Sequence, residues 1–154
     1  MKNLKKTIVE AVFKAGEGHI PSAFSVLDIL WVLYDKILSI NPKNPIDPKR
    51  DRFVLSKGHG SLGLYAVLAE KGFFAKKHLK SFGQFNSILG GHPDSLKVPG
   101  VEVSTGSLGH GFPTAVGIAM GMKIQKNKAK VYTIIGDGES NEGSVWESAL
   151  LANH

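Results

Sequence analysis

Three short glycine-rich loops constrain the fold of this chain more than any other feature of its sequence. Glycine makes up 18 of the 154 residues, and the three loops are GHGSLG at 58–63, GSLGHG at 106–111 and GDG at 136–138. The first follows a strand candidate at 52–56, and the third follows the apolar strand candidate KVYTII at 130–135. Glycine loops at strand ends are typical of α/β layer folds, in which ligands bind beyond the carboxyl ends of the strands.

The pattern of apolar residues predicts five helices around these strands. Ser22 is the expected N-cap of the second helix, Gly72 ends the third, and Gly117 and Gly121 in the fourth predict close packing of another backbone. Two strands are few for a sheet, which averages about 5–6 strands. We therefore expect an α/β fold with a parallel sheet flanked by helices, incomplete at the C-terminus, with 1–154 as part of one domain. The predicted helices span 4–15, 22–38, 62–71, 112–125 and 142–153.

The composition excludes several classes of protein. With 42% apolar and 21% charged residues, the chain can form a core, which excludes intrinsic disorder. The lack of cysteine excludes a disulfide scaffold and a thiolate metal site, and it fits a reducing cytoplasm. The net charge of +6 is spread without a basic stripe, so nucleic acid is not an expected partner. The most apolar run, 23–34, contains Asp28 and is too short for a membrane span of about 20 residues.

The loop at 58–63 matches G-x-G-x-x-G, the pattern of a dinucleotide-binding turn. That type of site also requires a second strand that ends in an acidic residue about 20 positions later. The region 78–83, HLKSFG, has neither feature, so we do not interpret the loop as a nicotinamide site. Its glycines either bring backbone amides close to an anion or only permit a tight turn.

Asp137 lies between two glycines at the end of a strand candidate and is the candidate metal ligand. Its uncrowded carboxylate suits Mg²⁺, which binds one or two carboxylates together with phosphate oxygens. The alternative is an ordinary Asx turn, which a single GDG sequence does not exclude. The three glycine loops together favour a site for a diphosphate and a metal ion.

Three of the six histidines lie in glycine-flanked loops: His19, His59 and His92. Neutral imidazoles near pH 7 suit proton transfer and hydrogen bonding to a polyhydroxylated substrate. A lone histidine is usually an ordinary surface or core residue, but three in such loops favour a function. Zinc is a weaker interpretation, because no pair has close ligand spacing such as H-x₃₋₅-H.

Four segments of the chain, in this order, resemble the N-terminal section of the transketolase family. The chain is similar in particular to the N-terminal subunit of two-chain transketolases found in many bacteria and archaea. The segments are GHIPSAFSVLDIL at 18–30, RDRFVLSKGHGSLGLYAVLAEKG at 50–72, GGHPDSLKVPGVEVSTGSLGHG at 90–111 and GDGESNEGSVWESALLA at 136–152.

The resemblance implies an enzyme that uses thiamine diphosphate and Mg²⁺ to move a two-carbon ketol unit from a ketose phosphate to an aldose phosphate. It implies that Asp137 ligates the metal, and that a cytoplasmic dimer or larger oligomer acts in the pentose phosphate pathway. The implied cofactor contacts are Gly106, Leu108 and Gly109, with Gly138 and Glu142 beside the diphosphate and the subunit boundary. The implied channel residues, which assist proton transfer, are His19, His59 and His92.

The chain also departs from the family pattern. Ser107 and His110 stand where many one-chain members have proline and glutamine, which leaves the contacts of His110 open. The family's second metal ligand, an asparagine roughly 30 residues after the aspartate, is not among the 17 residues that follow Asp137. The 154 residues also lack the pyrimidine domain and its activating glutamate. We therefore expect catalysis to need the rest of this domain and a C-terminal section or subunit.

Two alternatives to this interpretation stay open. A deoxyxylulose-phosphate synthase shares the cofactor and fold, although the segment RFVLSKGHG at 52–60 follows the transketolase form. The other alternative is a truncated, catalytically inactive chain that serves at most as a binding partner.

Overall fold

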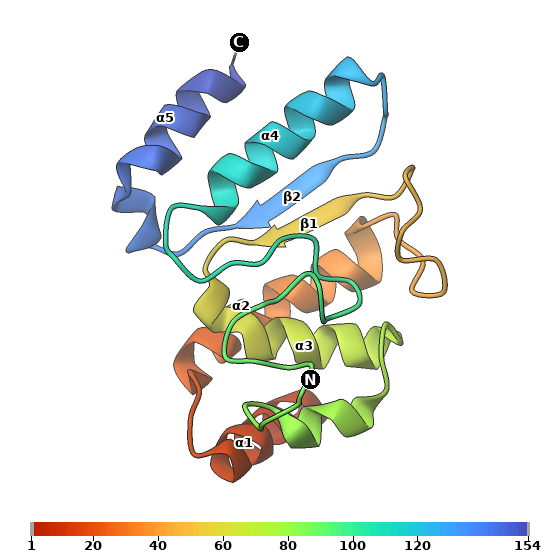
Figure 1. Cartoon of the computed structure of the whole chain (residues 1–154), viewed down its shortest axis with the longest axis vertical. Helices are drawn as coiled ribbons and strands as arrows, with labels where there is room; N and C mark the ends of the chain where they lie inside the picture. Colours follow the sequence, from red (N-terminus) through yellow and green to blue (C-terminus); the bar gives the residue numbers. More distant parts are fainter. Residues whose placement is uncertain (1, 154) are drawn as a thin grey trace.

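The computed structural model describes residues 2–153 as a chain of helices around one short pair of strands (Figure 1). A π-helical turn, Leu33–Ile37, extends α2, and short 3₁₀ turns span Gly58–Gly60, Lys76–Ser81 and Glu139–Asn141. No helix in this part of the chain combines the length and apolar character needed to cross a lipid bilayer. The main elements are α1 (Lys2–Ala15), α2 (Ile20–Val32), β1 (Arg52–Leu55), α3 (Ser61–Lys71), α4 (Gly111–Ile124), β2 (Val131–Ile134) and α5 (Gly143–Ala152).

The two strands form a parallel pair, as the sequence predicts. Arg52 lies opposite Val131, and Leu55 lies opposite Ile134. Figure 1 shows α4 and α5 on one side of the pair and α1, α2 and α3 on the other. Because the strands are parallel, the loops that follow β1 and β2 leave from the same edge of the sheet.

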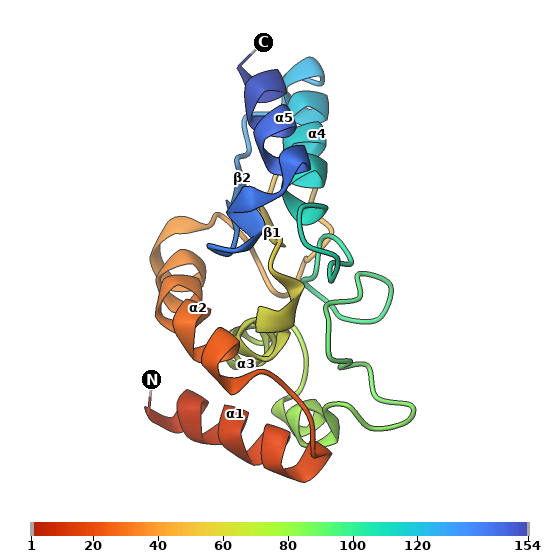
Figure 2. The same ribbon diagram turned by 90° about the vertical axis from the view of Figure 1, so that its left-hand side faces the viewer.

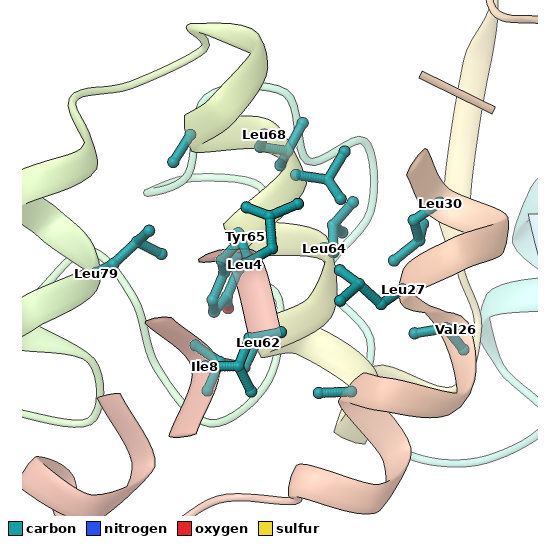
Figure 3. Close-up of a cluster of buried hydrophobic side chains, with 14 of the residues drawn as sticks. Leu4, Ile8, Val26, Leu27, Leu30, Leu62, Leu64, Tyr65, Leu68 and Leu79 are labelled. Atoms are coloured by element: carbon teal, nitrogen blue, oxygen red, sulfur yellow. The ribbon is translucent and has the colours of Figure 1, made fainter. Parts of the chain in front are cut away.

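The core lies in the N-terminal half, around α3. Every residue from 61 to 69 is buried, because α3 is apolar on all sides and is surrounded by other elements. Figure 3 shows Leu27 and Leu30 of α2 beside Leu64 of α3, with Leu4 and Ile8 of α1 on another side of that helix. The segment 83–110 runs along one side of the molecule, from the level of α1 to the start of α4 (Figure 2).

The structure corrects three local predictions. The second helix begins at Ile20 rather than after Ser22, because Pro21 fits the first turn, where its missing N–H breaks no hydrogen bond. The apolar sequence at 130–135 predicts a buried strand, but all four residues of β2 are only half-buried, because within residues 2–153 the strand has a neighbour on one edge alone. Nothing in the described chain packs within 4 Å of a Cβ built at Gly117 or Gly121.

Candidate active site

The three glycine loops meet at the carboxyl ends of β1 and β2. A Cβ atom on Gly58 would lie 2.7 Å from the carbonyl carbon of Thr105, just before the second loop. A Cβ atom on Gly111, at the other end of that loop, would lie 2.6 Å from the Cα of Ser56. Both distances are far below ordinary contact. Glycine is therefore required at these two positions so that the segment 105–111 can lie against the end of β1.

The middle glycine loop also contacts the start of α5. Gly109 has a φ of +76°, and a Cβ atom there would lie 2.8 Å from the Cβ of Glu142. The Ser144 hydroxyl donates a hydrogen bond of 2.7 Å to the carbonyl oxygen of Gly109. Leu108 is half-buried in the same loop, and its carbonyl oxygen lies 3.0 Å from Nδ1 of His110. The structure thus brings Gly109 and Glu142 together, although 33 positions separate them in sequence.

Asp137 is exposed in the loop that follows β2, three residues after the strand ends, at the same edge of the sheet. Within residues 2–153 its carboxylate accepts no hydrogen bond and joins no salt bridge. Its carbonyl oxygen accepts hydrogen bonds from the amide of Ser140 at 3.2 Å, from the hydroxyl of Ser140 and from the side-chain amide of Asn141. Gly138 is also exposed, with no atom within 4 Å of a Cβ built there. The described residues contain no group of three or more side chains that could hold a metal ion by themselves. One free carboxylate in an open glycine turn fits a cation whose other ligands are phosphate oxygens and water.

The three loop histidines lie close together. The rings of His19 and His59 are 5.8 Å apart between centroids and meet edge to face at 77°. The ring of His92 faces the second glycine loop, since a Cβ built on Gly106 would lie 3.3 Å from its Cδ2 atom. Partial burial lowers the pKa of His59, and the positive charges of Lys57 and of the other two histidines lower it further. The imidazole of His59 is therefore neutral near pH 7, which leaves a nitrogen free to accept a proton.

Two residues of α3 hold the loop of His92, and the sequence analysis did not identify either of them. The hydroxyl of Tyr65 donates a hydrogen bond of 2.8 Å to the carbonyl oxygen of His92, and the hydroxyl of Ser61 donates one of 2.7 Å to that of Gly91. Burial raises the pKa of Tyr65, and the charge of Asp94 adds to this, so its hydroxyl remains a donor. No local pattern marks these residues, because their partners lie 27 and 30 positions away.

A family model described as the transketolase thiamine diphosphate binding domain matches residues 1–154. One subunit of the apulose-4-phosphate transketolase of Phocaeicola vulgatus is 47% identical over 149 residues, which cover 97% of this chain and 53% of that protein. The 6-deoxy-6-sulfo-D-fructose transketolase subunit SqwG of a Clostridium species is 43% identical over 149 residues, which cover 97% of this chain and 54% of that protein. The chain spans about half the length of these curated relatives.

Solved structures show the same similarity. The transketolase from Leishmania mexicana superposes with a TM-score of 0.88 and is 32% identical in sequence. The match covers 98% of this chain and 24% of that one. The arrangement of helices and strands described above is therefore similar to one section of a much longer protein.

Proposed function

This chain belongs to the transketolase family. We propose that it forms part of an enzyme that transfers a two-carbon ketol unit between sugar phosphates. Its membership confirms the resemblance that the four sequence segments indicate. The convergence of three glycine loops beside an exposed carboxylate, at the carboxyl ends of two parallel strands, is the observation that carries the proposal. Such a position is where α/β folds bind phosphorylated ligands.

The residues around the loops fit a diphosphate bound through a magnesium ion. We assign the metal contact to the carboxylate of Asp137, which is exposed and unpaired within residues 2–153. Bound thiamine diphosphate would supply the nucleophilic carbon that takes up the ketol unit. Gly106, Leu108 and Gly109 would pack against the cofactor, because this loop lies between the end of β1 and the start of α5. Gly138 and Glu142 would lie beside the diphosphate and the subunit boundary.

We assign proton transfer and substrate contact to His19, His59 and His92. Their proximity supports this role, as does the lowered pKa of His59, which keeps that imidazole neutral near pH 7. Neutral imidazoles donate a hydrogen bond from one nitrogen and accept one at the other, which matches the hydroxyl groups of a sugar phosphate.

The proposal includes a partner polypeptide that carries the C-terminal section of the enzyme. The name of the Phocaeicola vulgatus relative describes it as one subunit of a transketolase, which supports an assembly of more than one chain. Apolar side chains on α4 and α5 support it as well, since Ile124 is 80% exposed and Leu150 is 72% exposed. We further propose a homo- or hetero-oligomer in the cytoplasm, acting on sugar phosphates of the pentose phosphate pathway. The cysteine-free composition fits that compartment.

Binding and turnover experiments on the chain, alone and with a partner, test this proposal. We expect the 154 residues alone to show no ketol transfer and only weak, Mg²⁺-dependent binding of thiamine diphosphate. Addition of a polypeptide with the rest of this domain and the pyrimidine domain should produce turnover. In that assembly Asp137→Ala should weaken Mg²⁺ binding by about 10–100-fold or more and abolish turnover. Asp28→Ala, which removes an exposed carboxylate on α2, is the matched control.

Three outcomes contradict the proposal. Ketol transfer by the isolated chain would show that the partner sections are not needed. Full activity of the assembly with Asp137→Ala would remove the metal assignment. An assembly that binds neither thiamine diphosphate nor Mg²⁺ would favour the alternative of an inactive chain that serves only as a binding partner.

A further inference from the structure

Glu139 is a buried carboxylate directly beneath the candidate active site. It lies in the 3₁₀ turn after the GDG loop and is only 1% exposed. No lysine, arginine or histidine within residues 2–153 forms a salt bridge with it. Burial of a carboxylate is costly unless hydrogen bonds replace the water that it loses. The hydrogen-bond donors around Glu139 must therefore account for its presence.

Three donors satisfy this carboxylate, and they come from three separate segments. Oε1 accepts a hydrogen bond of 3.0 Å from the amide of Gly109, in the second glycine loop. Oε2 accepts one of 3.0 Å from the amide of Gly136, in the GDG loop. The third donor is the hydroxyl of Ser56, at the end of β1, which bonds to Oε1. The same hydroxyl oxygen accepts a hydrogen bond of 2.9 Å from the amide of Phe112, at the start of α4.

This set of bonds requires a side chain with two acceptor oxygens. Both oxygens must accept, because the amides of Gly109 and Gly136 can only donate. A glutamine side chain would present one oxygen and one NH₂ group, so one of the two glycine amides would face another donor. Glutamate therefore joins the two loops in a way that its amide analogue cannot reproduce.

We propose that Glu139 is a positioning residue for the cofactor, which holds the second glycine loop and the GDG loop in their binding geometry. This inference rests on the proposed function, since it concerns the same site. Gly136 immediately precedes Asp137, so the bond to Oε2 fixes the backbone from which the metal-binding carboxylate projects. The bond to Oε1 fixes Gly109, which faces the start of α5. Loops held in place before binding do not lose conformational freedom when the ligand binds.

The first measurement needs no ligand. In Glu139→Gln at least one of the two amides, that of Gly109 or that of Gly136, should exchange its hydrogen about tenfold faster, since one hydrogen bond is lost. Amides in the middle of α3 should exchange as in the wild-type chain. Glu10→Gln is the matched control, because Glu10 is exposed on α1, where its carboxylate forms an ion pair with the exposed Lys6. Unchanged exchange at both glycines would overturn the inference at its structural step.

The second measurement is the affinity for thiamine diphosphate with Mg²⁺, followed by NMR titration of the isolated chain and of the assembly with the partner polypeptide. Under conditions in which each variant is fully folded, Glu139→Gln should weaken binding by about 10–100-fold, as expected for a group that orients a metal ligand. It should also raise the Mg²⁺ concentration needed for half-saturation. A residue that only stabilised the fold would lower the amount of folded protein and leave the affinity of the folded fraction unchanged.

The outcomes separate this inference from the function on which it rests. If the wild-type chain binds and Glu139→Gln binds equally well, the positioning role is wrong and the proposed function stands. If neither the wild-type chain nor its assembly binds thiamine diphosphate, the proposed function is wrong, and the role of Glu139 in that function is lost with it.

Discussion

The region around α3 and the region formed by β2, α4 and α5 are built in different ways. All residues of the segment 61–69 in α3 are buried, whereas β2 is half-buried throughout and α5 buries only Val145 and Ser148. The apolar core of α1, α2 and α3 does not depend on the C-terminal elements for most of its contacts. We conclude that the N-terminal half provides most of the stability, whereas the GDG loop and its carboxylate belong to the more open half.

Hydrogen bonds join the two halves, in addition to the apolar contacts that Tyr132 and Ile134 of β2 make with the N-terminal core. The carboxylate of Asp51 accepts hydrogen bonds from the amide of Ser39 at 2.8 Å and from that of Lys130 at 2.7 Å, so one side chain links the segment after α2 to the start of β2. The hydroxyl of Thr105 donates a bond of 2.7 Å to the carbonyl oxygen of Leu55. Such directional contacts fix the site loops in position and leave their surfaces accessible. This arrangement suits a site that must admit a ligand.

The largest expected difference between the halves comes from one pair of leucine substitutions. Leu68→Ala, in α3, should lower the free energy of unfolding by about 2–5 kcal/mol, because the side chain is fully buried. Leu150→Ala, in α5, should change it by no more than about 0.5 kcal/mol, because that side chain is 72% exposed. Urea denaturation followed by circular dichroism measures both. Similar losses in the two variants would contradict the division into a packed half and an open half.

A second pair of substitutions lies within α4 and tests the contact between the halves. Gly111→Ala should destabilise the chain by about 1–3 kcal/mol, because its Cβ would lie 2.6 Å from the backbone of Ser56. Gly117→Ala should stabilise it by about 0.5–1 kcal/mol, since the new methyl group meets no atom within 4 Å and alanine favours the helix. Thermal unfolding of both variants gives the comparison. A stabilised Gly111→Ala variant would show that α4 does not press against the end of β1.

The smallest expected effect concerns the pH dependence contributed by His59. Its lowered pKa means that the folded chain binds the imidazole proton less tightly than the unfolded chain does. The contribution of His59 to the free energy of unfolding is present above the ordinary pKa of 6.5. It is lost as the pH falls through the pKa of His59 in the folded chain. In NMR titration the His59 imidazole should therefore titrate below pH 6.5. His59→Gln should slightly reduce the loss of unfolding free energy at acid pH. An NMR titration midpoint above pH 6.5 for the His59 imidazole would contradict the burial of this ring.

Most of the elements follow from local sequence patterns. The apolar periodicity of 4–15 and 62–71 predicts two helices to within two residues at each end, and Gly72 ends the second with a φ of +88° as expected. The parallel pairing of the two strands is also confirmed. These predictions succeed because propensity, periodicity and capping depend on residues within about one or two helical turns. The N-cap at Ser22 failed for a local reason as well, since Pro21 is tolerated within the first turn.

The sequence by itself therefore determined the family, the α/β class, the glycine loops and the set of candidate residues. The tertiary structure alone decided how those residues meet. Ser56 and Glu139 are 83 positions apart, and no local pattern predicts that they share a hydrogen bond. Burial of Glu139 beneath the loops, and the incomplete burial of β2 despite its apolar sequence, also depend on which segments pack together. The physical reason is that burial and long-range hydrogen bonds are properties of the assembled chain, whereas periodicity and turn chemistry belong to its short segments.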